Sequence, residues 1–515
     1  MQVEQFLEES ARRSPDKTAL VCGGRRMTYA EIDTEANRMA RGLIRAGVRR
    51  GDRVAICLEN STEAVVSIFA TLKAGAVFMV VNPTTKADKL AFIANNSRAT
   101  ALVTDSRHRT VVNEIADCTP HTSVVVIAGR ETEVNANGKH SLAFGDLIGP
   151  GEDGSKPANP SIDIDLAALI YTSGSTGTPK GVMLTHLNVV SAATSITTYL
   201  DSRADDVVLN VLPLSFDYGL YQVLMTFKVG ATLILERSFT YPHAVLETLV
   251  AERATGFPIV PTISALLLQI DLGKYDLTSL RYITNTAAAL PTTHIVELRA
   301  RLPRVSLFSM YGLTECKRVS YLPPDQIDIR PASVGRGMPN EEVYIVDDQG
   351  NRLPSGVGEL VIRGANVMKG YWELPEETAR RLRPGPLPGE KVLYSGDVFR
   401  MDEEGYLYFV GRKDDIIKSR GEKVSPREVE NVLYELSAVA EAAVVGVADD
   451  VLGQAVKAVI TLRDGASLSE QDVLRHCSQR LENFMVPKVV EFRTTMPKTS
   501  TGKIDKKTLH MTAAG

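Results

Sequence analysis

The chain has 515 residues, of which 44% are hydrophobic and 23% are charged, and its formal net charge is −4. This composition is that of an ordinary globular protein and excludes disordered, collagen-like and coiled-coil chains. The length predicts several structural units and a core that needs no disulfide or structural metal. Because 58 Lys and Arg are balanced by 62 Asp and Glu, we expect no nucleic-acid partner.

The cysteines and the apolar segments indicate where the chain resides. An odd number of scattered cysteines without a CxxC pair argues for a reducing compartment and against a structural zinc site. The acidic amino terminus does not resemble a signal peptide. The most apolar stretch, Val207–Phe227, contains Asn210, Pro213 and Asp217, so it predicts a core strand, a turn and a core helix. We therefore expect a cytoplasmic protein without a membrane span.

Strand and helix patterns alternate along the first 260 residues. Thr28 and Glu31 form a capping-box pattern at the start of a helix. A strand over 51–58, a helix over 62–74 and a strand over 77–81 follow, and strand patterns recur at 123–128, 207–211, 231–235 and 255–259. This alternation is typical of mostly parallel sheets, so we predict two α/β subdomains. The Gly- and Pro-rich segment 149–160 predicts a linker between them.

The remaining third of the chain changes character twice. Over 334–410, short alternating strands with turn signals predict a small antiparallel barrel or sheet. After residue 412, the pattern predicts a helix (426–436), two strands (440–445 and 455–462), a second helix (470–481) and a last strand (489–492). We therefore predict an α/β protein with a large region, 1–411, that contains two α/β subdomains and a β-barrel-like subdomain, and a small α+β domain, 412–515.

The strongest local motif follows an apolar strand that ends at Tyr171. The next ten residues are all Gly, Ser, Thr, Pro or Lys. Their glycines permit close approach of the backbone to an anion, their hydroxyl groups donate hydrogen bonds, and Lys180 adds a positive charge. This segment predicts a polyphosphate loop, although it is neither a Walker A loop nor a dinucleotide fingerprint. The alternative is an ordinary surface loop rich in Gly and Ser.

This segment resembles the phosphate loop of the adenylate-forming superfamily, which contains acyl-CoA synthetases, luciferase-like ligases and adenylation domains of nonribosomal peptide synthetases. Further motifs of that superfamily follow in the same order: Tyr311-Gly-Leu-Thr-Glu, Tyr394-Ser-Gly-Asp, Gly411-Arg-Lys-Asp-Asp and Ser500-Thr-Gly-Lys-Ile. The resemblance extends from about residue 5 to about residue 510.

The resemblance implies a reaction in two steps. A carboxylic acid and ATP, with Mg²⁺, give an acyl-AMP and pyrophosphate, and the acyl group then passes to a thiol, for which CoA is our first expectation. A carrier-protein phosphopantetheine or a free amine is the alternative acceptor. A nucleotide-binding regulator without catalysis and a luciferase-like oxygenase are less favoured. The small domain 412–515 is expected to be a mobile lid, and the oligomeric state is not predicted.

The resemblance also implies site residues. Lys503, Thr314, Glu315 and Lys180 are the expected catalytic residues, and Glu315 is also the expected metal ligand. Asp414 is the expected hinge, and Gly421 lies in a loop expected to admit a pantetheine arm. The expected nucleotide-binding residues are Thr172, Ser173, Gly174, Ser175, Thr176, Gly177, Tyr311, Gly312, Asp397 and Arg412.

The resemblance places a substrate pocket around Asp217, whose carboxylate needs a partner inside an apolar run. Asp217 either holds a substrate amine or is neutralised internally by Lys317 or Arg318. We favour internal pairing, because two basic residues follow Glu315, and hence an acid without an amine. The expected pocket residues are Phe216, Asp217, Tyr218, Tyr221, Asn285, Thr286, Ala287, Met310, Arg318 and Val319.

Overall fold

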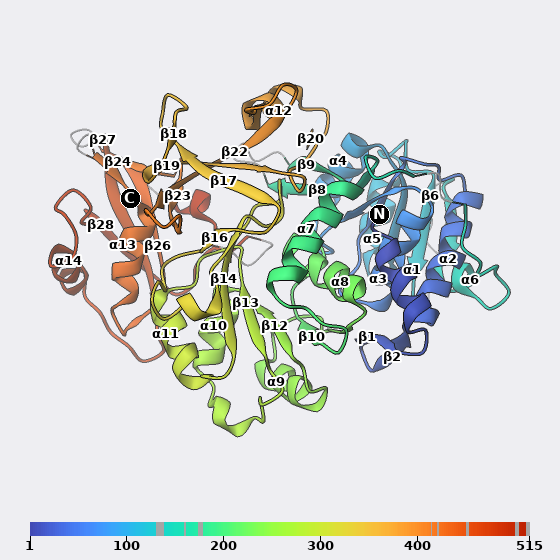
Figure 1. Cartoon of the computed structure of the whole chain (residues 1–515), viewed down its shortest axis with the longest axis horizontal. Helices are drawn as coiled ribbons and strands as arrows, with labels where there is room; N and C mark the ends of the chain where they lie inside the picture. Colours follow the sequence, from blue (N-terminus) through green and yellow to red (C-terminus); the bar gives the residue numbers. More distant parts are fainter. Residues whose placement is uncertain are drawn as a thin grey trace.

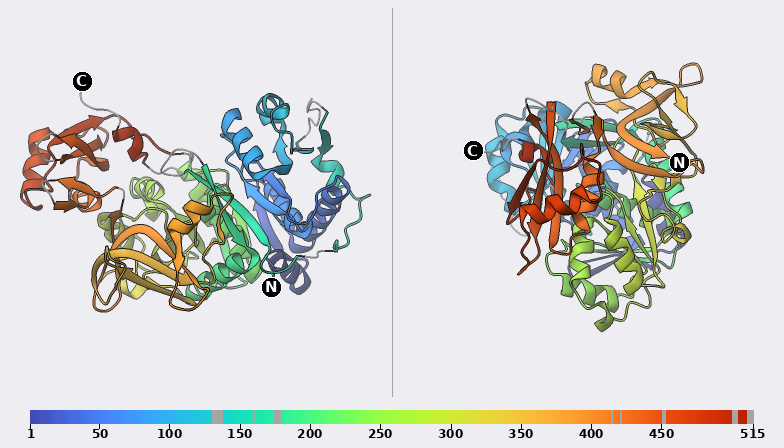
Figure 2. Two further views of the ribbon diagram at one scale, coloured as in Figure 1. Left: turned by 90° about the horizontal axis from the view of Figure 1, so that it is seen from above. Right: turned by 90° about the vertical axis from the view of Figure 1, so that its left-hand side faces the viewer.

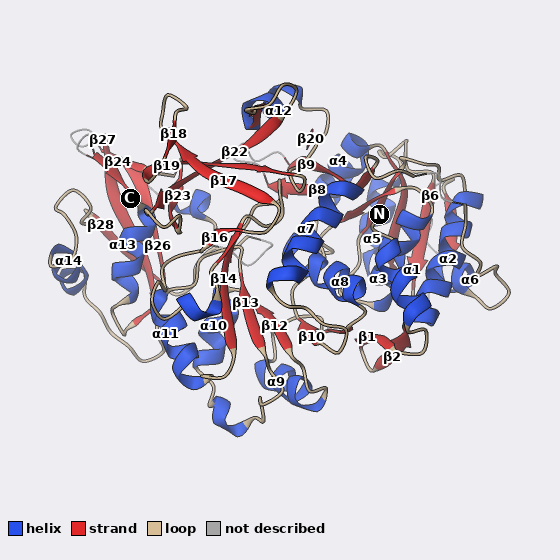
Figure 3. Cartoon of the chain, viewed as in Figure 1, coloured by secondary structure: helices blue, strands red, loops and turns tan. Residues whose placement is uncertain are grey.

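The computed structural model describes residues 1–129, 138–158, 161–173, 179–413, 415–419, 422–449, 453–499 and 504–510. These residues form four β-sheets with helices packed on them (Figures 1 and 3). Seen from above in Figure 2, the first α/β unit and the C-terminal unit lie at opposite ends of the molecule. The α/β class that the alternating pattern predicts is confirmed.

The first α/β unit is built on an eight-stranded sheet with the order β20-β9-β8-β4-β3-β5-β6-β7. Its strands from β3 to β8 are parallel, whereas β9 and β20 are antiparallel additions at one edge. The strands are β3 (Arg53–Ile56), β4 (Val77–Val80), β5 (Ala99–Asp105), β6 (Val124–Ala128), β7 (His140–Ala143), β8 (Leu166–Ser173), β9 (Pro179–Thr185) and β20 (Gly370–Tyr371). The helices are α2 (Tyr29–Arg45), α3 (Thr62–Lys73), α4 (Ala87–Ser97), η1 (Ser106–His108), α5 (Arg109–Ala116) and α6 (Phe144–Ile148).

The second α/β unit is built on a nine-stranded sheet with the order β16-β15-β14-β13-β12-β10-β11-β1-β2. Its strands are β1 (Thr18–Cys22), β2 (Arg25–Thr28), β10 (Val207–Asn210), β11 (Thr232–Leu235), β12 (Gly256–Ile259), β13 (Tyr282–Asn285), β14 (Ser306–Tyr311), β15 (Ser320–Tyr321) and β16 (Arg336–Gly337). Its helices are α1 (Gln5–Arg13), α7 (His186–Tyr199), α8 (Asp217–Val229), α9 (Pro242–Ala251), α10 (Pro261–Leu268), η2 (Leu272–Lys274), α11 (Thr292–Arg301) and η3 (Pro324–Gln326).

A shared helical layer joins the two α/β units. Phe69 of α3 stacks on Phe227 of α8, with ring centroids 5.0 Å apart, and the edge of Tyr29 of α2 meets the same ring. Figure 1 shows α3 and α8 side by side between the sheets. The apolar stretch 207–227 is thus the strand β10, a turn and the buried helix α8, as predicted. In the described part of the chain, no helix combines the length and the apolarity needed to cross a bilayer.

The segment expected to form a barrel or sheet forms a six-stranded antiparallel sheet with the order β18-β17-β19-β22-β21, with β23 also paired to β22. Its elements are β17 (Glu341–Val346), β18 (Arg352–Leu353), β19 (Gly356–Gly364), α12 (Pro375–Arg381), β21 (Leu382–Pro384), β22 (Lys391–Met401) and β23 (Leu407–Arg412). Two short strands of this segment, β16 and β20, instead extend the two α/β sheets. They tie the antiparallel sheet to both α/β units.

The chain beyond β23 forms a separate sheet with its own apolar core. Its elements are β24 (Ile417–Ser419), β25 (Glu422–Val424), α13 (Pro426–Tyr434), β26 (Val439–Asp449), β27 (Gly453–Leu462), α14 (Glu470–Ser478), β28 (Val489–Arg493) and α15 (Lys506–His510). Arg427 of α13 donates to the carbonyl oxygen of Ala289 at 2.9 Å, which is a direct contact with the second α/β unit.

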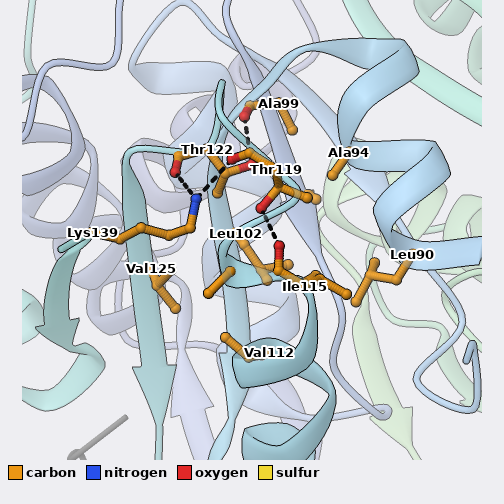
Figure 4. A pocket seen from close by; sticks show the side chains of 12 residues that line it. Leu90, Ala94, Ala99, Leu102, Val112, Ile115, Thr119, Thr122, Val125 and Lys139 are labelled. Carbon is orange, nitrogen blue, oxygen red and sulfur yellow. Dashed lines mark hydrogen bonds between the residues drawn. The ribbon is translucent and has the colours of Figure 1, made fainter. Parts of the chain in front are cut away.

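A small cavity lies inside the first α/β unit, between α4, α5 and the sheet (Figure 4). The Lys139 ammonium borders it and donates to the carbonyl oxygens of Thr119 and Thr122 at 2.7 and 2.6 Å. Its volume of about 10 Å³ holds at most about one water molecule. This cavity is too small to hold a nucleotide.

Candidate active site

The parallel strands β12, β13 and β14 end at one edge of the second sheet. Ligands of open α/β sheets bind beyond such carboxyl ends, and the expected residues Asn285, Met310 and Tyr311 lie there. Gly312 follows at a crowded turn, because a Cβ atom there would lie 2.3 Å from the carbonyl oxygen of Lys317. Only glycine fits this turn, which directs the chain from β14 toward Thr314 and Glu315.

An aromatic ring, a carboxylate and a guanidinium meet next to this edge. The Tyr311 hydroxyl donates to Asp397 Oδ2 at 2.6 Å, and Arg412 Nε donates to Asp397 Oδ1 at 3.0 Å. Asp397 and Arg412 are cross-strand partners on β22 and β23, which fixes their spacing. Burial and the Asp397 charge raise the pKa of Tyr311 well above its ordinary value. The phenol therefore stays protonated and holds the carboxylate in place.

Glu315 is oriented by a tyrosine from the antiparallel edge of the other sheet. The Tyr371 hydroxyl of β20 donates to Glu315 Oε1 at 2.6 Å. Burial raises the pKa of Tyr371, and the nearby Glu315 charge adds to the increase, so Tyr371 remains a donor. Among the described residues, no group of three or more His, Cys, Asp or Glu side chains is arranged to hold a metal. A single carboxylate fits Mg²⁺, which takes its other ligands from substrate phosphates and water.

The predicted phosphate loop connects two antiparallel strands. In the register of β8 and β9, Thr172 pairs with Lys180 and Ser173 pairs with Pro179. The Lys180 ammonium contacts Glu377 Oε2 of α12 at 2.7 Å and lies 5.8 Å from the centre of the Tyr371 ring. The hydrogen bond from Lys180 lowers the pKa of Glu377. The lysine at the end of the loop is therefore held by a carboxylate in this structure.

Asp217 at the start of α8 has an internal partner. The Lys317 ammonium lies 3.4 Å from Asp217 Oδ2 and 4.3 Å from the centre of the Tyr221 ring. Burial lowers the pKa of Lys317 to about 7, while the Asp217 charge acts in the opposite direction. Of the two basic residues considered as partners, Lys317 is the one that pairs with Asp217. What this pair does in catalysis stays a prediction.

The other expected pocket residues surround this pair. The Tyr218 hydroxyl donates to the Thr284 carbonyl oxygen at 2.8 Å, and the Phe216 ring packs edge-on against Tyr218. The Asn285 Oδ1 and Thr286 Oγ1 atoms are buried without a hydrogen-bond partner. Ala287 has a φ of 75°, which is strained for a residue other than glycine. Met310, Arg318 and Val319 are buried.

Several expected residues lie outside the described residues, and their placement is untested. They are Gly174, Ser175, Thr176, Gly177, Asp414, Gly421 and Lys503.

Sequence reasoning missed Tyr371 and Glu377, which orient Glu315 and Lys180. It also missed Glu359, which accepts from Lys413 at 3.0 Å and from the Gly396 amide at 3.1 Å beside Asp397. None of these residues belongs to a motif. For Tyr371, the only available signal was the aromatic Gly-Tyr-Trp segment at 370–372.

Comparisons with known proteins agree with this geometry. A family model described as "AMP-binding enzyme" matches residues 7–372, and one described as "AMP-binding enzyme C-terminal domain" matches residues 428–503. The chain is 32% identical to a long-chain-fatty-acid–CoA ligase of Bacillus subtilis, over 98% of this chain and 94% of that protein. It is 36% identical to a feruloyl-CoA synthase of an Amycolatopsis species, over 96% of each.

Solved structures share the fold, among them the following three. The anthranilate CoA ligase AuaEII, in complex with anthranoyl-AMP, superposes with a TM-score of 0.89 at 29% identity, over 99% of this chain and 96% of that one. ATP-bound MatB from Rhodopseudomonas palustris gives 0.89 at 30% identity, over 99% of both chains. The amide bond synthetase McbA from Marinactinospora thermotolerans gives 0.87 at 28% identity, over 99% of both. The chain therefore belongs to the AMP-binding enzyme family and is an adenylate-forming ligase.

Proposed function

We propose that the chain activates a carboxylic acid with ATP and then transfers the acyl group to the thiol of CoA. In the first step, a carboxylate oxygen attacks the α-phosphorus of ATP and pyrophosphate leaves with the bridging oxygen. In the second step, the thiolate sulfur attacks the acyl carbon and AMP leaves. The observation that carries the proposal is the meeting of Tyr311, Asp397 and Arg412 beside the ends of the parallel strands.

The chemistry of these side chains matches a nucleotide. The Tyr311 ring offers an aromatic face to the adenine, the buried Asp397 carboxylate can accept from both ribose hydroxyls, and Arg412 adds a positive charge. Glu315 would hold Mg²⁺, which neutralises phosphate charge when bound. Lys180 and the Thr314 hydroxyl would contact phosphate oxygens. Two anions must meet in the first step, so charge neutralisation and positioning matter more than proton transfer.

The C-terminal part completes the proposal. We assign residues 1–411 to the acid- and nucleotide-binding region and residues 412–515 to a lid that turns about Asp414. Lys503 would bridge the carboxylate and the α-phosphate in the first step, and Gly421 would face the pantetheine arm in the second. We also propose a cytoplasmic location, because the five cysteines are all free, as expected in a reducing compartment.

The second candidate function has another acceptor. The likeness to an amide bond synthetase supports an amine as the nucleophile, and a carrier-protein phosphopantetheine is the remaining thiol. The first step is the same in all three cases, so only the product distinguishes them.

The test is pyrophosphate release over a panel of carboxylic acids, with and without CoA, followed by mass spectrometry of the products. We expect release that depends on ATP and Mg²⁺, and an acyl-CoA product when CoA is present. Asp397→Asn should raise the KM for ATP at least about 10-fold, because a charge-assisted contact is lost. The exposed Asp328→Asn variant is the matched control. An amide product would favour the second candidate, and no release with any acid would refute adenylation.

A further inference from the structure

Arg318 carries a buried positive charge that no described side chain neutralises. The residue is 1% exposed, and its Nε and Nη1 atoms are buried without a hydrogen-bond partner. Its neighbour Lys317 pairs with the Asp217 carboxylate, and the Arg318 guanidinium carbon lies 5.2 Å from the centre of the Tyr218 ring. Burying an unpaired charge is costly, which indicates that the partner of Arg318 arrives with a ligand.

Glu341 of β17 is a candidate internal partner, because the Asn366 amide donates both to Glu341 and to the Arg318 carbonyl oxygen. Its Oε2 atom accepts from Asn366 Nδ2 at 2.6 Å, but its Oε1 atom has no hydrogen-bond partner. Burial raises the pKa of Glu341 well above its ordinary value, which favours the neutral carboxyl group. Among the described residues, no ion pair joins Glu341 to Arg318. Glu341 therefore leaves the guanidinium charge unbalanced.

The backbone holds Arg318 in position, although its side chain is unpaired. Asn366 Nδ2 donates to the Arg318 carbonyl oxygen at 3.2 Å and to the Cys316 carbonyl oxygen at 2.8 Å. Lys317 has a φ of 69°, a left-handed conformation that is costly for lysine. A strained and braced turn that presents a free guanidinium is a preorganised binding group.

The surroundings place this group in the expected acid pocket. The Tyr218 ring that contacts Arg318 also donates its hydroxyl hydrogen to the Thr284 carbonyl oxygen at the end of β13. Thr286, two residues later, has a buried hydroxyl oxygen without a partner. A planar guanidinium donates two parallel hydrogen bonds to a carboxylate, so a carboxylate is a fitting partner for Arg318.

We propose that Arg318 binds a second carboxylate of the acid substrate, so that the enzyme activates one carboxyl group of a dicarboxylic acid. This inference rests on the adenylation proposed above and adds the class of acid. The reacting carboxylate lies with the phosphates near Thr314 and Lys180, and Arg318 receives the distal carboxylate.

The experiment compares dicarboxylic acids with their monomethyl esters, which remove only the distal charge. The probes are the straight-chain diacids from malonic to adipic acid, benzene-1,3-dicarboxylic acid and benzene-1,4-dicarboxylic acid, each beside its ester. Pyrophosphate release gives kcat/KM, and calorimetry without ATP gives the dissociation constant of the same acid. We expect wild type to prefer at least one diacid over its ester by about 100-fold or more, as for a buried charge pair.

Variants of Arg318 distinguish a loss of binding to the distal carboxylate from a loss of activity on all acids. Arg318→Gln should lower kcat/KM for the diacid about 100-fold, change that for the ester less than about 3-fold, and weaken diacid binding in parallel. Arg318→Lys should restore part of the preference, because it keeps the charge but not the planar fork. Arg352→Gln, which removes an exposed arginine paired with Glu342, is the control and should match wild type.

Each result decides for or against the inference. Equal use of diacid and ester by wild type, or activity on acids with one carboxyl group alone, would overturn it. An equal loss on diacid and ester in a folded Arg318→Gln variant would also overturn it, because Arg318 would then serve the reacting carboxylate or the fold. No pyrophosphate from any acid would instead contradict the adenylation reaction itself.

Discussion

The buried pair of Asp217 and Lys317 predicts how the Asp217→Asn variant responds to pH. The two charged groups are 3.4 Å apart, and burial has already lowered the pKa of Lys317 to about 7 in the presence of the carboxylate. Without the Asp217 charge, that pKa falls further, because burial and the neighbouring Arg318 both disfavour the ammonium. The variant therefore carries a neutral lysine in the acidic range where the wild-type pair is charged.

The loss of stability expected for the Asp217→Asn variant follows from the linkage between proton binding and folding. One pKa unit corresponds to about 1.4 kcal/mol, so the variant should lose about 1.4 kcal/mol of stability at pH 6 and about 2.7 kcal/mol at pH 5, until its own lysine protonates. The direction of the change in stability with pH follows from the unfolded chain, in which the Lys317 ammonium has its ordinary pKa of 10.5. As the pH rises from 7 to 10.5, the free energy of unfolding of the wild type increases, because the unfolded chain holds the lysine proton and the folded chain does not. In the variant, the same increase begins below pH 7. Above pH 8, Lys317 is neutral in both folded proteins, and the difference in stability between wild type and variant shrinks to about 1 kcal/mol or less.

The assay is urea unfolding at pH 5, 6, 8 and 9, followed by fluorescence of Trp372, the single tryptophan. Each variant is compared with wild type at the same pH. Lys317→Met should remove the pH-dependent part of the Asp217→Asn effect. Asp328→Asn, at a carboxylate whose side chain is 64% exposed, is the control and should show little effect at any pH. A difference that stayed constant from pH 5 to pH 9 would refute the lowered pKa of Lys317.

Three further predictions concern the phosphate side of the site. Tyr371→Phe should lower kcat for adenylation about 10-fold and raise the Mg²⁺ concentration needed for half-maximal rate, because Glu315 loses the hydrogen bond that orients it. Glu377→Gln should lower the KM for ATP about 2- to 5-fold, because Lys180 is released from a partly exposed ion pair. Lys503→Ala should slow acyl-AMP formation by about 100-fold or more, and it should leave transfer from supplied acyl-AMP nearly intact.

Matched controls exist for the Tyr371 and Glu377 variants. Tyr344→Phe removes a hydroxyl from the antiparallel sheet, where the ring packs beneath Arg352, and should leave the Mg²⁺ dependence unchanged. Glu376→Gln alters the exposed neighbour of Glu377 and should not change the KM for ATP. An unchanged Mg²⁺ requirement in Tyr371→Phe, a higher KM in Glu377→Gln, or equal slowing of both steps in Lys503→Ala would each contradict the corresponding argument.

The sequence predicted those parts of the fold that depend on local patterns. The capping box of Thr28 and Glu31 forms both of its hydrogen bonds, at 3.2 and 2.7 Å, at the start of α2. Alternating patterns located the parallel strands, because each buried strand and amphipathic helix carries its own periodicity. The destinations of β16 and β20 could not be predicted, since two-residue strands have no periodicity, and the partner of β20 also lies far away in the chain.

In the site, too, the residues of local motifs could be predicted, whereas contacts between distant segments could not. Tyr311, Glu315 and Asp397 belong to motifs, and the structure brings Tyr311 and Asp397 into contact. Tyr371 lies 56 residues from Glu315, and Glu377 lies 197 residues from Lys180. Such pairs depend on how separate sheets pack, which local sequence does not encode. The pairing of Lys317 with Asp217 is likewise a contact between distant segments of the chain.

The cross-strand register of Asp397 and Arg412 also limits how this chain can be re-engineered. Arg412 is the last residue of β23, and inserting or deleting one residue within that strand would turn its side chain to the opposite face of the sheet. The carboxylate of Asp397 would then lose its guanidinium, and the same change would shift the start of the C-terminal unit. Chimeras that exchange C-terminal units between relatives should therefore be joined after Lys413, with β22 and β23 taken from one parent.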